Sequence, residues 1–306
     1  MGIFYKKSDI PDHLQKYFVP AEIGLEQTPE QYIAAMVEVF RCVRDVLADD
    51  GTLWLNIGDS YAANRSYQVP STKGGTKHGP GQAVGGKSSV VPVGLKPKDL
   101  IGIPWLLAFA LRAEGWYLRQ DIIWAKPNPM PESVRDRCTK AHEYVFLLSK
   151  SERYFFDSEA MKEPAVSEKP AGNNRHKYAD AYAAGGSDEH RTKAGLLALK
   201  GVEWTTRNRR SVWTVATRPY KGAHFATFPP ALIEPCILAG SRPRDIVLDP
   251  FMGSGTTAAV ALQHGRQYLG CELNAEYGAL QAERINEATE AAACAAAQPD
   301  LFERAA

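Results

Sequence analysis

The stretch Asp245-Ile-Val-Leu-Asp249-Pro-Phe-Met-Gly253-Ser-Gly255-Thr-Thr, followed by Gln267-Tyr-Leu-Gly-Cys-Glu272, decides the fold of this 306-residue chain. Its first apolar run predicts a buried strand over residues 245–249, and the two glycines predict a turn. Residues 256–264 predict a helix closed by Gly265, and residues 267–272 predict a second strand. Strand, turn, helix and strand in this order form the unit of a parallel α/β sheet.

The same unit is suited to a ligand that carries a ribose. Gly253 and Gly255 let the backbone approach a ligand without a Cβ in the way. The helix that begins at Thr256 offers free N–H groups and the positive end of its dipole to a carboxylate or a phosphate. Glu272 lies about twenty residues beyond the turn, where an acid accepts both ribose hydroxyls.

The turn alone does not separate NAD from S-adenosylmethionine, because Gly253-Ser-Gly-Thr-Thr-Ala258 fits the relaxed dinucleotide pattern. A dinucleotide fold needs further strands after this unit, whereas here one more helix is expected, from residue 275 to about residue 287. Asp249 and Phe251, just before the turn, suit an ammonium group and an adenine face. The alternative interpretation is that this strand, turn, helix and strand bind no ligand. The acid at residue 272 disfavours it, because it is hard to explain without a ligand.

Upstream, the chain predicts further helices and strands of an α/β core. Thr28-Pro-Glu-Gln31 is typical of a helix N-terminus, and apolar residues follow it at helical spacing. Residues 52–57 predict a buried strand that ends at Gly58-Asp59. His142-Glu143 lies on another predicted strand and lacks a second histidine at helical spacing. We therefore favour a structural role for this pair over a metal or general-base role, and we expect no metal site.

Two polar stretches interrupt this pattern. Residues 62–98 are rich in Gly, Ser, Thr and Pro and contain basic residues but no acid. Such a composition predicts either a solvated linker or a mobile loop that closes on a phosphate backbone. Residues 161–210 are polar and irregular and end in the basic cluster Arg207, Arg209 and Arg210, which indicates an insertion between strands.

The overall composition narrows the functional classes. A formal net charge of +1 means that any basic surface must be local. No apolar stretch reaches membrane-spanning length, so no membrane association is expected. The five cysteines are scattered, which is typical of reduced cytosolic thiols and of neither a disulfide framework nor a zinc site.

The motifs closely resemble those of the permuted DNA amino-methyltransferases. Residues 249–257 and 266–277 resemble the cofactor motifs of that family, and residues 224–232 resemble the segment that lines the methionine end of the cofactor. Segments 23–62, 121–128, 142–143 and 212–213 also match, in the same order. The resemblance implies an α/β fold with a doubly wound, Rossmann-like, mostly parallel methyltransferase sheet and a polar target-recognition insertion.

The resemblance also implies how the chain is divided. The catalytic half would occupy residues 1–160, with residues 62–98 as its mobile basic loop. The target-recognition insertion would occupy residues 161–210, the cofactor-binding half residues 211–290 and a tail residues 291–306. The late cofactor motif fits the permuted group, in which the catalytic half comes first.

The activity implied is site-specific transfer of a methyl group from S-adenosylmethionine to N4 of cytosine or N6 of adenine in double-stranded DNA. The target base would be flipped out of the duplex. The residues expected to bind the cofactor are Asp249, Phe251, Gly253, Ser254, Gly255, Thr256, Glu272 and Phe228. The residues expected to contact DNA are Arg65, Lys73, Lys77, Lys126, Arg207, Arg209 and Arg210. A cytoplasmic, bacterial or phage-encoded protein with a cognate restriction endonuclease is the expected setting.

The catalytic motif of the family, a polar residue followed by Pro-Pro-aromatic after a central strand, is not recognisable. The corresponding stretch is Ser8-Asp-Ile-Pro-Asp-His13, and the adjacent prolines Pro229-Pro230 precede a helix. One hypothesis is that the chain lacks this strand and motif, with Ile3-Phe-Tyr5 as a short substitute strand. A second is a relative that binds cofactor and DNA without catalysis. A third, the least favoured, assigns catalysis to Asp59 and Tyr61.

Two further choices stay open. Without the catalytic motif, cytosine and adenine are not separated, although the resemblance of the central segment leans towards cytosine. A dinucleotide-dependent oxidoreductase is the second alternative function, because the glycine turn also fits that class.

Overall fold

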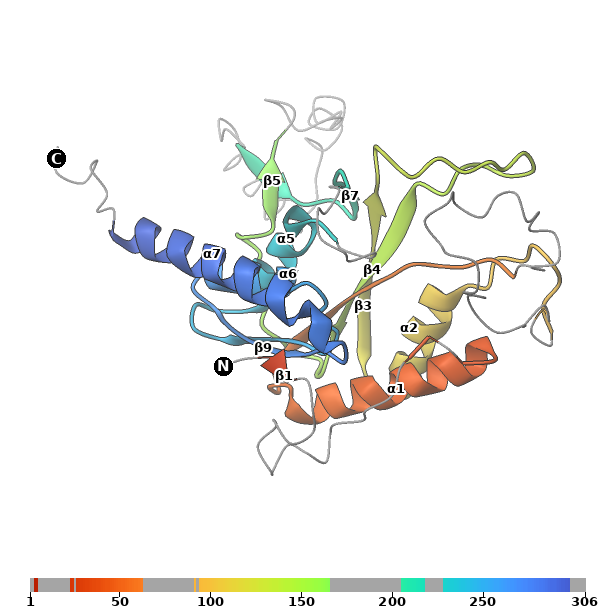
Figure 1. The fold of residues 1–306 in the computed structure, drawn as a ribbon, viewed down its shortest axis with the longest axis horizontal. Coiled ribbons are helices and arrows are strands. Elements are labelled where there is room, and N and C mark those ends of the chain that lie inside the picture. The colour runs from red at the N-terminus through yellow and green to blue at the C-terminus, as the bar shows by residue number, and fades with distance from the viewer. Residues whose placement is uncertain are drawn as a thin grey trace, which may run out of the picture. The chain divides into compact units, whose positions relative to one another are not determined.

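The computed structural model describes residues 3–4, 23–24, 26–62, 91, 94–165, 205–217 and 228–297. The chain divides into two compact units, one of Met1–Asp157 with Ser211–Ala306 and one of Ser158–Arg210. The larger unit holds the helices α1, α2, α5, α6 and α7 and most of the strands (Figure 1).

Helix α1 (Pro29–Val46) begins where the capping pattern predicts. The Thr28 hydroxyl accepts the backbone N–H of Gln31 at 3.3 Å, and the Gln31 side chain accepts the N–H of Gln27 at 3.2 Å. The first bond satisfies a donor that the first turn of the helix leaves open, and the second fixes the residue before the cap. Apolar residues at helical spacing turn one face of α1 towards the core, among them Met36, Val37, Phe40 and Val43.

A four-stranded sheet has the order β2-β4-β3-β7. Its strands are β2 (Thr52–Ile57), β3 (Tyr117–Ala125), β4 (His142–Ser149) and β7 (Val212–Thr214). Strand β4 is antiparallel to both β2 and β3, whereas β3 and β7 are parallel. The strands predicted around residues 52–57 and 142–148 are therefore confirmed.

Helices cover both faces of this sheet, as the alternation along β2 shows. Leu53, Leu55 and Ile57 pack into the core formed with α1 and α2 (Ile103–Ala113). Trp54 points to the opposite face, where it contacts the rings of Phe156 and Trp213. The α/β, doubly wound class predicted from the motifs is confirmed in this arrangement.

Helix α5 (Pro230–Gly240) reaches that second face through its last residue. A Cβ added to Gly240 would lie 2.5 Å from Thr52 Oγ1 and 2.8 Å from Trp54 Nε1. Such a separation is too short for real Cβ contacts, so glycine is required where the end of α5 approaches β2.

The second sheet carries the glycine turn of Gly253 and Gly255 together with the strands on either side of it. It has the order β1-β9-β8, with β1 (Ile3–Phe4), β8 (Ile246–Asp249) and β9 (Gln267–Cys271) all parallel. Helix α6 (Thr256–Gln263) joins β8 to β9, and the 3₁₀ turn η5 (Ala275–Tyr277) leads into α7 (Gly278–Ala297). Leu248 of β8 packs against the same apolar core as α1 and α2. The predicted strand, turn, helix, strand and helix are all confirmed.

Strand β1 does not replace a central strand. Ile3 pairs with Gly270 and Phe4 with Cys271, so β1 lies on the outer side of β9. In the part of the chain that the structure describes, β2 and β8 each end their ladder, and no strand pairs with their other edges. The hypothesis of a substitute central strand at this place is wrong, because Ile3 and Phe4 pair with the edge of β9 instead.

In each of the two polar stretches, residues near its start pair with residues near its end. The N–H of Lys98 donates to the carbonyl of Ala62 at 2.6 Å, and a bridge joins Tyr61 to Leu100, so the ends of the 62–98 segment meet. In the smaller unit, β5 (Lys162–Pro164) pairs antiparallel with β6 (Thr206–Asn208). Residues 63–90, 92–93 and 166–204 lie outside the described residues. Among the helices described, none is long and apolar enough to span a bilayer.

Candidate functional site

The glycine turn between β8 and α6 has a backbone that only glycine adopts easily. Gly253 has φ +53° and Gly255 has φ +82°, both in the left-handed region. The N–H of Met252 donates to the carbonyl of Cys271 at 2.9 Å, which ties the turn to the end of β9. Gly255 is the N-cap of α6 and has no side chain to cap it, so the first N–H groups of the helix face the turn.

Glu272 lies beside this turn. One carboxylate oxygen, Oε2, accepts the N–H of Gly253 at 2.8 Å, and the other, Oε1, accepts the N–H of Asn274 at 2.8 Å. The acid at the end of β9 is therefore held in one orientation by two backbone donors. Each oxygen keeps a second lone pair with which it can accept a hydroxyl of a ligand.

Asp249 is the acid at the end of β8. Its Oδ1 accepts the N–H of Phe251 at 2.9 Å and its Oδ2 accepts the hydroxyl of Thr257 at 2.5 Å. Burial raises the pKa of the Asp249 carboxyl above its ordinary value, although these two hydrogen bonds lower it. The charge of Glu272 raises the Asp249 pKa further. A cation placed here would favour the ionised form of Asp249.

Phe251 is exposed although its neighbours are not. Its side chain is 47% exposed, whereas Met252 and Ser254 are each 3% exposed. An aromatic ring in such a position offers one face to a planar ligand. Phe228 lies half-buried just before α5, and the structure places Pro229 between it and the helix.

Ser254 and Thr256 are buried, and their hydroxyls point towards α7. Both accept hydrogen bonds from the guanidinium of Arg284, with 2.8 Å from Nη1 to Ser254 Oγ. These bonds tie the residues on both sides of Gly255 to α7. The turn, the two carboxylates and the exposed ring are the kinds of group that bind the anionic part, the ribose, the ammonium group and the base of a ligand in which an adenosine carries an amino acid.

Asp59, one of the two weak catalytic candidates, caps helix α2. Its Oδ1 accepts the N–H groups of Ser60, Gly102 and Ile103 at 2.8, 2.9 and 3.1 Å. The N-cap residue of α2 is Gly102, which has no side chain of its own, so Asp59 provides the missing cap from the end of β2. The other candidate, Tyr61, has the guanidinium of Arg137 4.1 Å above its ring.

Two substitutions of Asp59 separate capping from catalysis. We expect Asp59→Ala to lower the free energy of unfolding by about 1 kcal/mol, the usual cost of a lost cap. Asp59→Asn should leave stability nearly unchanged, because an asparagine oxygen accepts the same N–H groups. Urea unfolding measures both. If methyl transfer collapses in Asp59→Asn while stability is kept, then Asp59 does more than cap α2.

A second polar cluster lies where β2 and β3 end and β4 begins. The ammonium of Lys126 forms an ion pair with Glu143 Oε1, and the amide of Asn56 donates to Glu143 Oε2 at 3.3 Å. Lys126 also lies 4.3 Å from the centre of the Trp124 ring. The Lys126 and Glu143 side chains are only 18% and 26% exposed. Glu143 therefore contacts two neighbouring strand ends, and its partner Lys126 is the residue that was predicted to contact DNA.

The arginines predicted to contact DNA from the insertion share an acid. Arg207 and Arg210 both donate to Glu163 Oε1, at 2.8 and 3.0 Å. Burial alone would raise the Glu163 pKa, but the two guanidiniums outweigh it and the pKa is lowered. Arg210 is still 68% exposed, whereas Arg209 is half-buried. Arg65, Lys73 and Lys77 lie outside the described residues.

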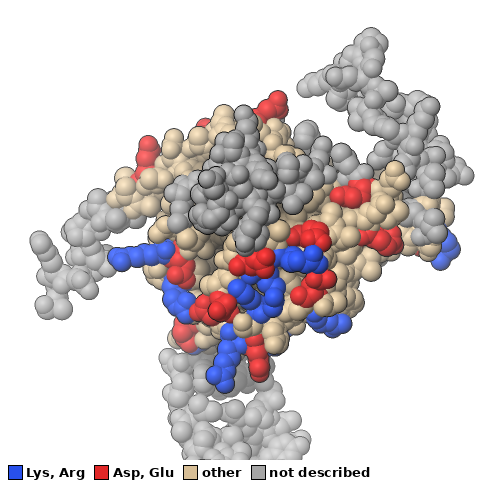
Figure 2. Space-filling model, turned by 90° about the horizontal axis from the view of Figure 1, so that it is seen from below, with Lys and Arg blue, Asp and Glu red and all other residues tan. Residues whose placement is uncertain are grey.

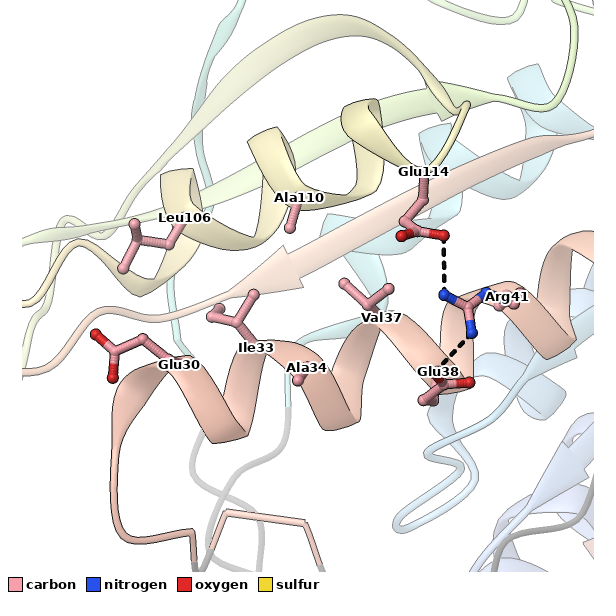
Figure 3. A pocket seen from close by; sticks show the side chains of 9 residues that line it. All are labelled: Glu30, Ile33, Ala34, Val37, Glu38, Arg41, Leu106, Ala110 and Glu114. Atoms are coloured by element: carbon pink, nitrogen blue, oxygen red, sulfur yellow. Dashed lines mark hydrogen bonds and ion pairs between the residues drawn. The ribbon is translucent and has the colours of Figure 1, made fainter.

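A groove of 420 Å³ between α1 and α2 is separate from the glycine turn (Figure 3). Its one guanidinium, Arg41, is already paired with Glu38 and Glu114. On the face seen in Figure 2, basic and acidic side chains of the described residues interleave, so that face does not present the field of one sign that would attract phosphates. Across the described segments, no group of three His, Cys, Asp or Glu residues is placed to hold a metal ion.

Two residues that contact the turn were missed by the sequence argument. Gln281 and Arg284 lie within the helix predicted at residues 275–287, and neither belongs to the quoted motifs. The available signal was their spacing, because residues three apart share a helix face. That face meets the glycine turn only through tertiary packing.

Comparison with known proteins places this geometry in a family. The family described as DNA methylase, of the N6/N4 type, matches residues 9–283 of the chain. The type II methyltransferase M.XycI of Xanthomonas campestris pv. cyanopsidis is 49% identical over 273 residues, covering 89% of this chain and 77% of the relative. M.SmaI of Serratia marcescens is 47% identical over 273 residues, covering 89% and 80%.

Solved structures share the fold. The PvuII DNA methyltransferase, described as cytosine-N4-specific, superimposes with a TM-score of 0.55 at 17% identity and covers 89% of this chain and 81% of its own. A putative DNA modification methylase from Thermus thermophilus, complexed with S-adenosyl-L-methionine, gives a TM-score of 0.52 at 22% identity and covers 88% and 82%.

Proposed function

This chain belongs to the DNA methylase family, and from that membership we propose that the glycine turn of Gly253 and Gly255 holds its S-adenosylmethionine. It is an S-adenosylmethionine-dependent DNA methyltransferase that modifies an exocyclic amino group of a base. Family membership removes the alternative of a dinucleotide-dependent oxidoreductase.

The observation that carries the proposal is the contact between Glu272 and Gly253. It joins the acid at the end of β9 to the turn at the end of β8, so a ribose over the turn meets the carboxylate. We assign the adenine face to Phe251 and the ammonium group to Asp249. The N-terminus of α6 faces the carboxylate of the methionine part.

When bound, S-adenosylmethionine supplies an activated methyl group. The residues of this chain orient that cofactor: Glu272 fixes the ribose, and Asp249 holds the ammonium group through its charge. Since a base amino group is unreachable inside the duplex, the acceptor base has to leave the stack to meet the cofactor.

The element order supports the permuted arrangement. Strand β2 and helices α1 and α2 precede the cofactor unit, which begins only at β8. We therefore assign residues 1–160 to the catalytic half and residues 211–290 to the cofactor half, with residues 291–306 as a tail. The insertion of residues 161–210 is the proposed target-recognition region, because it forms its own compact unit and exposes Arg210.

Phosphate contacts are proposed for the basic 62–98 segment, whose Arg65, Lys73 and Lys77 can neutralise the backbone of double-stranded DNA. The proposed acceptor atom is N4 of cytosine, on the resemblance of the segment around Gly58-Asp59 alone. A cognate endonuclease that cleaves the same unmethylated sequence is the proposed partner. Asp59 and Tyr61 remain the candidates for contact with the amino group.

The experiment is transfer of labelled methyl from S-adenosylmethionine to unmethylated DNA by the full chain. We expect incorporation, and digestion of the product to nucleosides followed by mass spectrometry should give N4-methylcytosine. N6-methyladenine instead would overturn the cytosine assignment and leave the rest intact. Folded protein that binds S-adenosylhomocysteine without transferring methyl would favour the catalytically impaired relative.

A further inference from the structure

We infer that Gln281 and Arg284 of helix α7 are positioning residues of the cofactor site, which hold the glycine turn from the side opposite the ligand. The inference rests on the proposed placement of S-adenosylmethionine at that turn. Neither residue belongs to the motif from Asp249 to Glu272. Helix α7 lies alongside α6, which begins at the turn (Figure 1).

Gln281 and Glu272 hold the same glycine, Gly253, through the two peptide groups on either side of its Cα. The amide of Gln281 donates to the carbonyl of Gly253 at 2.6 Å, while Glu272 accepts the N–H of the same residue at 2.8 Å. Both hydrogen-bonding groups of Gly253 are therefore engaged. Because Gln281 is only 1% exposed, water does not compete for this bond.

Packing at Gly255 adds to this constraint. A Cβ built on Gly255 would lie 3.4 Å from the Cα of Gln281, so the backbone of α7 closes directly on the second glycine. A turn with two residues at positive φ has other conformations available unless its surroundings select one. Gln281 selects the conformation in which the turn meets the ligand.

Arg284 acts one turn further along the same helix face. Its Nη1 bonds the hydroxyls of Ser254 and Thr256, which flank Gly255. The guanidinium thereby brings a positive charge to the first turn of α6, where the helix dipole is also positive. An anionic group over the turn, such as the carboxylate of the methionine part, is attracted by both.

Titration calorimetry with S-adenosylhomocysteine tests the role of Gln281. Gln281→Met keeps the size of the side chain but removes the donor, so we expect binding to weaken about tenfold. Gln281→Glu places an acceptor against the Gly253 carbonyl and should weaken binding further. Gln263→Met, on the exposed end of α6, is the matched control and should bind as the wild type does.

Kinetics distinguish positioning from general destabilisation. We expect Gln281→Met to raise KM for S-adenosylmethionine without changing KM for DNA. Folded Gln281→Met with affinity within about twofold of Gln263→Met would overturn the role of Gln281. If Glu272→Gln loses binding while Gln281→Met binds as the wild type does, the positioning role of Gln281 is refuted and the proposed cofactor site is kept. Wild-type protein that fails to bind would refute the proposed site itself.

Arg284 is tested with two ligands that differ in the amino-acid part. Arg284→Gln removes the charge, so S-adenosylhomocysteine should lose more affinity than 5′-methylthioadenosine, which has no carboxylate. Arg284→Lys keeps the charge and should restore much of the preference. An equal loss for both ligands in Arg284→Gln would overturn the electrostatic role.

Discussion

Replacing Glu272 by glutamine is expected to weaken binding of S-adenosylhomocysteine about 100-fold, because two charge-assisted hydrogen bonds to the ribose are lost or weakened. The amide of a glutamine also cannot make both hydrogen bonds that the Glu272 carboxylate makes to the backbone in the absence of ligand. Both oxygens accept backbone N–H groups, from Gly253 and from Asn274, so the amide nitrogen of a glutamine would face one of these donors. Calorimetry measures the affinity, and methyl incorporation at low cofactor concentration measures the consequence.

The matched control is Glu276→Gln. Glu276 is an exposed acid four positions further along the chain, so the change of charge is the same but the turn is untouched. We expect wild-type affinity from this variant. Equal affinities in Glu272→Gln and Glu276→Gln would contradict the proposed ribose contact.

The second large effect is expected at Asp249. Asp249→Asn should weaken binding of S-adenosylmethionine about 30-fold, because the variant loses the negative charge proposed to face the ammonium group. The asparagine is of the same size and can still bond Thr257 and the N–H of Phe251, so the turn should keep its shape. A loss of affinity in this variant would therefore report the loss of the negative charge and not a change in the shape of the turn.

The same substitution should change how stability depends on pH. Burial raises the folded-state pKa of Asp249 above its unfolded value, so the folded state binds the proton more tightly. The stability that this group contributes is present at low pH and is lost as the pH rises through the raised pKa. Unliganded wild type should therefore lose stability relative to Asp249→Asn as the pH rises above about 4, the ordinary pKa of an aspartate.

Thermal unfolding across that pH range measures the difference, with Asp121→Asn as the control at an exposed aspartate. This control measures the effect of an Asp-to-Asn change at a position away from the glycine turn. If the stability difference between wild type and Asp249→Asn does not change with pH, then the surroundings of Asp249 do not raise the pKa of its carboxyl. If it changes but cofactor affinity is kept, only the ammonium contact is wrong.

Several features of the site were determined by the sequence alone. The order of apolar run, glycines and acid around Gly253 and Glu272 predicted the strand, the turn and the next strand, and all are present. Thr28 and Gln31 predicted the start of α1 for a similar reason. Each prediction rests on residues that are close in the chain, where backbone conformation and capping follow from the residues themselves.

Tertiary structure alone decided which distant residues meet. Asp59 follows a strand and was expected at most to touch the amino group, yet it caps a helix that begins more than forty positions later. Lys126 was predicted to contact DNA, and the ion pair that it forms with Glu143 was not predicted. One hypothesis placed a substitute strand at residues 3–5 in the centre of a sheet, but β1 lies at an edge.

The physical reason is that pairing between strands and packing between helices depend on contacts between residues far apart in the chain. A short strand such as β1 carries hydrogen-bonding groups that fit any open edge, and its own residues do not specify which edge. The contact of Gln281 with Gly253 likewise exists only once α7 packs against α6. The sequence therefore determined the parts that are proposed to bind the cofactor, whereas the tertiary structure decided which residues hold those parts in place.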